Sequence, residues 1–171
     1  MQKLNFKEIL TPALSLFLIC FVIAGALAAV NAVTADPIAA NLAGEADDAK
    51  QEIFPGATFE DRGDYFEAYA GETLLGYCMD TEAQGYGGIL KMAVGLDPEG
   101  RVLKVQAVSA DGETPGLGQK VKEEGFLSQF TGKADINGID SIAGATISSK
   151  GVEDAVNMAL EIYNEQIKGD S

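Results

Sequence analysis

The fold class follows from one stretch, Ile89-Leu-Lys-Met-Ala-Val-Gly-Leu-Asp-Pro-Glu-Gly-Arg-Val-Leu-Lys-Val-Gln-Ala-Val108. Two apolar runs, 89–96 and 102–108, lie on either side of Asp97-Pro-Glu-Gly100. Asp, Pro and Gly are favoured at the first, second and fourth positions of a type I turn. Two runs of this length joined by a short turn are typical of a β-hairpin. The stretch therefore predicts two antiparallel strands.

A second hairpin is predicted upstream, where runs 65–70 and 73–79 flank Gly71-Glu72. Downstream, residues 119–130 predict a short helix. A longer helix is predicted over 150–168, because apolar residues recur there at steps of three and four; they are Val152, Ala155, Val156, Ala159, Tyr163 and Ile167. Four strands followed by packed helices predict an α+β domain with a mixed or antiparallel sheet.

A long uncharged segment, residues 9–35, precedes this domain. About 20 apolar helical residues cross the hydrocarbon core of a bilayer. We predict a single transmembrane anchor over 1–35, a juxtamembrane helix or linker over 36–64 and the domain over 65–168. A cleavable signal peptide is the alternative, but its apolar region spans only about 7–15 residues.

The charge distribution predicts the orientation of the anchor in the membrane and argues against nucleic acid as a partner. Lys3 and Lys7 precede the apolar segment, so the positive-inside rule predicts a cytoplasmic N-terminus and an extracytoplasmic domain. The chain has a net charge of -14, which disfavours binding to nucleic acid. It has no His and two Cys, so no metal site is predicted, and difficult chemistry must come from an organic cofactor or from carboxylates and hydroxyls.

The segment Asp140-Ser-Ile-Ala-Gly-Ala-Thr-Ile-Ser-Ser149 lies at the start of the last predicted helix. Its small residues permit close approach of a ligand to the backbone, and a helix start favours a phosphate. Thr146, Ser148 and Ser149 supply hydroxyls in this segment. The competing interpretation is a loop whose hydroxyl residues cap the helix.

Two more glycine-rich segments precede it. In Asp111-Gly-Glu-Thr-Pro-Gly-Leu-Gly-Gln-Lys120, Pro115-Gly116 predicts a type II turn, and Glu113 and Lys120 are possible polar contacts. In Gln84-Gly-Tyr-Gly-Gly-Ile89, the glycines predict a bend or a close backbone contact. Taken alone, each is compatible with a purely structural turn.

The ordered set Gly-Tyr-Gly-Gly, Glu-Thr-Pro-Gly-Leu-Gly and Asp-x-x-x-Gly-Ala-Thr resembles the covalent FMN-binding domain family. This family includes the G subunits of Rnf ion-translocating electron-transport complexes and the C subunits of sodium-pumping NADH:quinone reductases. The resemblance spans about residues 53–168. It implies FMN esterified through its phosphate to Thr146 by a flavin transferase that uses FAD and magnesium. One departure is Ala143, where the family usually has Ser or Thr.

The resemblance also implies the surroundings of the flavin and the role of the chain. The predicted cofactor-binding residues, besides Thr146, are Gly144, Ala145, Ser148, Glu113, Thr114, Gly116, Leu117, Gly118, Lys120, Tyr86 and Gly87. None of them is assigned a catalytic role. The implied function is an electron carrier within a complex in the cell membrane, partnered by other membrane proteins of that complex, that couples ferredoxin/NAD electron transfer to sodium or proton translocation. The alternatives are an extracytoplasmic binding or scaffolding module and a stand-alone flavoprotein reductase.

Overall fold

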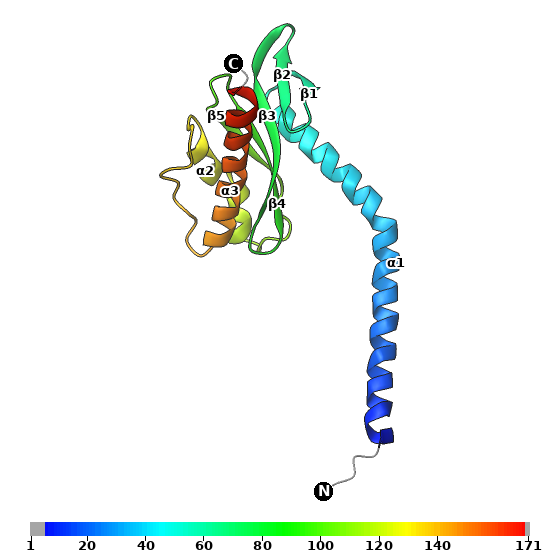
Figure 1. The fold of residues 1–171 in the computed structure, drawn as a ribbon. Helices are drawn as coiled ribbons and strands as arrows, with labels where there is room; N and C mark the ends of the chain where they lie inside the picture. The colour runs from blue at the N-terminus through cyan, green and yellow to red at the C-terminus, as the bar shows by residue number, and fades with distance from the viewer. Residues whose placement is uncertain (1–5, 170–171) are drawn as a thin grey trace. The chain divides into compact units, whose positions relative to one another are not determined.

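The computed structural model describes residues 6–169, with side chains from residue 10 onward. It forms two compact units, 1–41 and 42–171 (Figure 1). Lys3 and the side chain of Lys7, on which the predicted orientation rests, lie outside the described residues. The elements after the first helix are β1 Thr58–Asp61, β2 Phe66–Ala70, β3 Thr73–Gln84, β4 Ile89–Leu96, β5 Val102–Ser109, α2 Glu124–Leu127 and α3 Thr146–Ile162.

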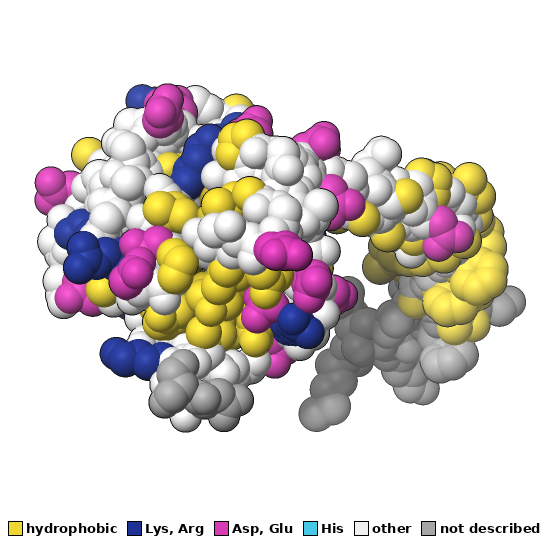
Figure 2. Space-filling model, turned by 90° about the horizontal axis from the view of Figure 1, so that it is seen from above, with side chains coloured by type: hydrophobic (Ala, Val, Ile, Leu, Met, Phe, Trp, Pro, Cys, Tyr) yellow, Lys and Arg dark blue, Asp and Glu magenta, His cyan; other side chains and the backbone are white. Residues whose placement is uncertain are grey.

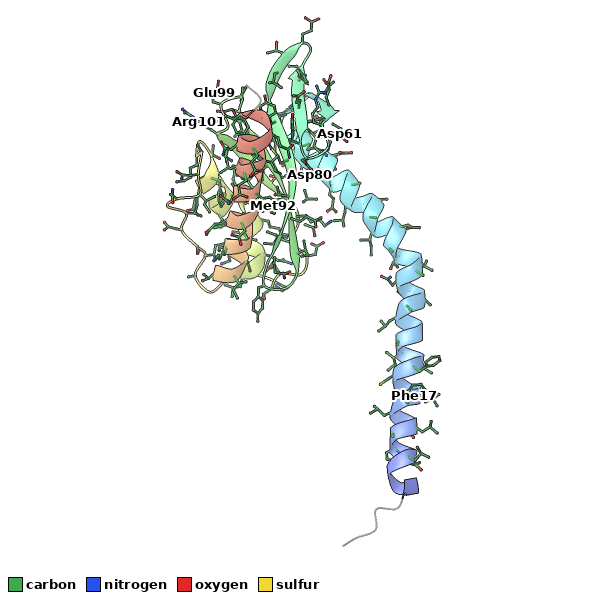
Figure 3. All side chains as sticks on the ribbon, viewed as in Figure 1. Phe17, Asp61, Asp80, Met92, Glu99 and Arg101 are labelled. Carbon is green, nitrogen blue, oxygen red and sulfur yellow. The ribbon has the colours of Figure 1, made fainter. Side chains whose placement is uncertain are left out.

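The first helix, α1, runs from Phe6 to Ile53. Its apolar side chains between residues 10 and 33 are exposed, as Figure 3 shows for Phe17. Among the described residues it is the one helix long and apolar enough to span a membrane, and its apolar window is not buried. A core helix of a soluble domain would be buried, so the exposed apolar surface supports membrane association. The helix does not break between the expected anchor and the expected juxtamembrane helix.

The sheet is an antiparallel meander with strand order β1-β2-β3-β4-β5. Both predicted hairpins are confirmed, and the N–H of Gly100 donates to the carbonyl of Asp97 at 3.0 Å in the turn between β4 and β5. The sequence predicted four strands, and this number was wrong. The fifth strand, β1, lies in the segment expected to be a linker.

Helix α3 covers one face of the sheet (Figure 1). The helix predicted over 150–168 is α3 followed by a π-helical segment, Tyr163–Ile167. Its predicted apolar face packs in the core with strand residues such as Met92 (labelled in Figure 3): Val152, Ala155, Val156, Ala159 and Tyr163 are buried, and Ile167 is partly buried. Gly151 permits a close approach, because a Cβ there would lie 2.8 Å from the carbonyl oxygen of Gln84. The helix start is thereby fixed beside the turn that joins β3 to β4.

The opposite face of the sheet packs against Ala49 and Ile53 in the last turns of α1 and against Phe54, the residue after the helix. Cys78 is fully buried in this layer. At its edge, the ammonium of Lys50 lies 3.2 Å from Asp80 on β3 (Figure 3) and 3.1 Å from Asp47. Residues 42–53 are therefore part of the globular unit.

The single helix expected over 119–130 is instead two 3₁₀ segments, Gly118–Lys122 and Ser128–Phe130, with α2 between them. Val121, Phe126 and Phe130 from this region fill the core beside α3. On the face seen in Figure 2, acidic side chains are spread over the surface of the globular unit. This distribution agrees with the net charge of the sequence.

Candidate functional site

A cavity of about 430 Å³ opens where the three glycine-rich segments meet. It is lined by Tyr86, Thr114, Leu117, Gly118, Gly144, Ala145, Thr146, Ile147 and Ser148. Small-molecule sites are usually concave, with volumes of about 300–1,000 Å³. The structure therefore brings three segments separated in the sequence around one space of ligand size.

The close contact of the first two segments depends on glycine. A side chain at Gly87 would overlap the backbone carbonyl of Gly112. Gly116 has φ +74°, and the N–H of Leu117 donates to the carbonyl of Thr114 at 3.2 Å, so the type II turn at Pro115-Gly116 is confirmed. This turn places the side chain of Leu117 against Gly144 of the third segment.

The start of α3 forms one wall of the cavity. Its N-cap residue is Ala145, and no described side chain caps the helix. The first N–H that donates within the helix is that of Ser149, to the carbonyl of Ala145 at 2.9 Å. The N–H groups of the preceding helical residues therefore have no acceptor within the helix, and they carry the positive end of its dipole. Such a terminus favours a bound phosphate.

Three hydroxyl side chains lie in the first turn of α3, and they differ in exposure. Ser148 and Ser149 are 1% and 0% exposed. The hydroxyl of Ser148 donates to Glu113, and the hydroxyl of Ser149 accepts from the N–H of Ile142 at 3.0 Å. Thr146 is exposed and lines the cavity. Thr146 thus carries the solvent-accessible hydroxyl of this turn.

The side chain of Glu113 is 2% exposed and lies behind the cavity wall. Its Oε1 accepts from the N–H of Gly87 at 3.2 Å, and its Oε2 accepts from the hydroxyl of Ser148. One carboxylate therefore links the second segment to the first and to the third. Both oxygens of this buried carboxylate thus have a hydrogen-bond donor.

Most of the predicted cofactor-binding residues line the cavity, and four do not. Glu113 and Gly87 lie behind it, and Gly116 lies in the adjoining turn. Lys120 lines a separate hollow of about 220 Å³ with Asp140. The expectation that these four contact a flavin stays a prediction. Their positions favour indirect roles.

Ile147 lines the cavity but was not among the predicted residues. It is 56% exposed, and the neighbouring Tyr86 and Leu117 are 69% and 39% exposed. The sequence signal for Ile147 is its position directly after Thr146. It is apolar but does not belong to the apolar face predicted for the last helix. The cavity thus has an apolar, solvent-facing rim of Tyr86, Leu117 and Ile147, which suits one face of an aromatic ring.

Residues 85–161 match the FMN-binding domain family, and this range contains all three glycine-rich segments except Gln84. The chain is 33% identical over 109 residues to the G subunit of the proton-translocating ferredoxin:NAD(+) oxidoreductase complex of Clostridium ljungdahlii. That match covers 57% of this chain and only 58% of the relative. The chain is also 29% identical to the G subunit of the Na(+)-translocating ferredoxin:NAD(+) oxidoreductase complex of Acetobacterium woodii, over 97% of each chain.

Solved structures agree with this match. The C subunit of the Na(+)-translocating NADH-quinone reductase of Parabacteroides distasonis has a TM-score of 0.50 and 26% identity, over 59% of this chain and 60% of that chain. Shewanella oneidensis NqrC, at 20% identity, shares the fold with a TM-score of 0.53, over 67% of this chain and 70% of that one. Residues 85–161 are thus similar to the FMN-binding domain family, and the antiparallel sheet with packed helices is similar to that of these C subunits.

Proposed function

We propose that the chain is a membrane-anchored electron carrier that holds FMN in the cavity described above, esterified through its phosphate to the hydroxyl of Thr146. The observation that carries the proposal is the exposed hydroxyl of Thr146 at an uncapped helix start, inside a cavity built from three segments of an FMN-binding domain. FMN, when bound, supplies the redox chemistry.

The residues present fit the two ends of FMN. The lining residues include no Lys or Arg among those that the structure describes, so the helix start offers the compensating positive potential for the phosphate. A phosphate esterified to Thr146 is a phosphodiester, which carries one negative charge instead of nearly two. The apolar rim of Tyr86, Leu117 and Ile147 covers ring surface, and the glycines keep the backbone close to it.

Attachment requires an enzyme, because a threonine hydroxyl at its ordinary pKa is a poor nucleophile. We propose a flavin transferase that uses FAD and magnesium and approaches α3 from its exposed first turn. The oxygen of Thr146 bonds to the FMN phosphorus of FAD and loses its proton, the pyrophosphate bond breaks, and AMP leaves. Ala143 is exposed beside that turn, so its methyl group leaves access to Thr146 open. Thr146 is therefore an anchoring residue and takes no part in turnover.

The setting of the carrier follows from its relatives and from α1. The relatives named above belong to ion-translocating ferredoxin:NAD(+) oxidoreductase complexes. We propose that this chain serves the same kind of complex, in contact with other membrane proteins of that complex, and passes electrons through its flavin. We further propose that α1 crosses the cell membrane with the N-terminus in the cytoplasm and the FMN domain outside.

The test is expression of the full-length chain with and without a flavin transferase, followed by fluorescence of the denatured band. A fluorescent band that requires both the transferase and Thr146 supports the proposal. A band that persists in Thr146→Val, or no band with an active transferase, contradicts it. Reporter fusions at each end test the orientation, which a cytoplasmic C-terminus contradicts. Recovery of the tagged chain from native membranes without any other protein of the complex contradicts the assignment to a complex.

A further inference from the structure

The buried carboxylate of Glu113 has a role that direct flavin contact does not explain. Its two oxygens accept hydrogen bonds from two different walls of the cavity, the N–H of Gly87 and the hydroxyl of Ser148. Of these partners, Ser148 lines the cavity and Glu113 itself does not. The carboxylate is therefore separated from the cavity by one side chain.

The surrounding backbone is shaped to admit this carboxylate. A side chain at Gly85 would overlap its Oε1, and a Cβ at Gly118 would lie 2.7 Å from its Oε2. Gly118 also lies against the hydroxyl of Ser148, at 3.3 Å from the position of a Cβ. Two glycines from different segments thus leave room for one buried charge.

The charge has no basic side chain beside it in the described part of the chain. Its hydrogen-bond partners are a backbone N–H and a hydroxyl, and no ion pair includes Glu113. Away from water, the field of such a charge is weakly screened and extends into the neighbouring cavity. An electron that enters a flavin in this cavity brings negative charge close to a fixed negative charge.

We propose that Glu113 is a positioning residue that also tunes the flavin: its carboxylate holds the 85–88 turn and Ser148 around the cavity, and its negative charge lowers the reduction potential of a flavin bound there. This inference rests on the proposed function. The hydrogen bond from Ser148 disperses part of the carboxylate charge, so loss of that bond strengthens its effect on the flavin.

Two variants of the full-length, flavin-loaded chain are expected to shift the potential in opposite directions. Glu113→Gln keeps the size and the acceptor for Gly87 but removes the charge, so the potential becomes more positive. Ser148→Ala, titrated at a pH high enough to keep the Glu113 carboxyl ionised, keeps the charge and removes its hydrogen bond, so the potential becomes more negative. The matched control is Glu123→Gln, the same charge change at an exposed position, where solvent screens the charge and the potential stays unchanged.

The measurement is a spectroelectrochemical titration of each variant, preceded by circular dichroism to verify the fold. Shifts of opposite sign support the proposal, because a purely structural defect does not produce them. A potential for Glu113→Gln equal to that of the parent, in a folded protein, overturns it. If Glu113→Gln does not fold, Ser148→Ala decides: an unchanged or more positive potential overturns the proposal.

Failure of the underlying function is seen separately, before any potential is measured. If the parent chain carries no flavin on a denaturing gel, the proposed attachment is wrong. If the parent is loaded and both variants titrate like it, the attachment stands and only the role of Glu113 is wrong. If the parent chain binds FMN without a covalent bond, the same titration of the parent and its variants still tests the role of Glu113.

Discussion

Replacement of Thr146 by Val separates an attachment residue from a helix cap. The hydroxyl of Thr146 makes no hydrogen bond within the described residues, and its side chain is exposed. Surface substitutions of this kind change the free energy of unfolding by no more than about 0.5 kcal/mol. A capping hydroxyl, in contrast, contributes about 1 kcal/mol. We therefore expect Thr146→Val to leave stability almost unchanged and to abolish flavin attachment.

Ser148→Ala is the matched comparison from the same helical turn. The hydroxyl of Ser148 is buried and donates to a carboxylate. Loss of a hydrogen bond to a charged group costs about 1.5–3 kcal/mol, so this variant is expected to be destabilised by at least about 1 kcal/mol more than Thr146→Val.

The assay is denaturant unfolding of the flavin-free full-length chain in detergent. Tyrosine fluorescence or circular dichroism reports the transition, because the chain contains no Trp. The reasoning is refuted if Thr146→Val shifts the midpoint as much as Ser148→Ala does. That result would identify Thr146 as a structural residue of the helix start.

Three further predictions concern the scaffold of the site. Gly151→Ala places a methyl group 2.8 Å from a backbone carbonyl of β3, so we expect a loss of about 1–3 kcal/mol in denaturant unfolding. Gly125→Ala meets no atom within 4 Å, and an equal loss in this control would contradict the packing argument. Burial raises the pKa of Cys78 to about 12. In a Cys20→Ser background, Cys78 of the folded protein is therefore expected to resist iodoacetamide at pH 8 and to react only when the protein is unfolded. Rapid labelling of the native protein, detected by mass spectrometry, would contradict this expectation. Burial lowers the pKa of Lys50, but the hydrogen bonds and charges of its two Asp partners outweigh that effect and raise the pKa above its ordinary value. Its partners are partly exposed, so Lys50→Met should cost only about 1 kcal/mol. Because the pKa of Lys50 is raised on folding, the difference in free energy of unfolding between the parent chain and Lys50→Met should persist at neutral pH and shrink as pH rises through and above 10.5. A difference that grows with pH in urea unfolding would refute the pairing of Lys50 with its Asp partners.

The strands that surround the site were predictable because their turns carry specific chemistry. The turn at residues 97–100 and the pair Gly71-Glu72 delimit apolar runs of strand length. β1 was missed because it has only four residues, mostly exposed, at the edge of the sheet. So short and exposed a strand lacks the alternation of apolar and polar residues that marks a half-buried strand. The expected helix over 119–130 divided into 3₁₀ and α turns, one of them containing Gly125, a poor helix former.

The extent of α1 was harder to predict for a different reason. The uncharged apolar segment that predicts a membrane span ends before Asp36, where charged residues begin again. The helix continues through an Ala-rich segment, and its last turns are stabilised by packing of Ala49, Ile53 and the following Phe54 onto the sheet. Tertiary contacts of this kind are invisible to a local pattern.

For the site, the sequence identified which segments meet but did not distinguish direct from indirect contacts. Glu113 and Ser148 are both polar residues in the motifs. Only the structure shows that Ser148 lines the cavity and that Glu113 lies behind it, hydrogen-bonded to Ser148. Ile147 was missed because exposed apolar residues are common and carry little information singly. Thr146 was predicted as the attachment residue from its place in a motif, and its exposure relative to Ser148 and Ser149 required the three-dimensional structure.

Peptide mapping of the flavin-loaded chain is the most direct test of the central claim. Trypsin cleavage after Lys133 and Lys150 releases one peptide, 134–150, that contains every hydroxyl of the third segment. Fragmentation of this peptide is predicted to locate an FMN group on Thr146 and on no serine. An FMN group on Ser141, Ser148 or Ser149, or an unmodified peptide from protein made with an active transferase, would contradict the account.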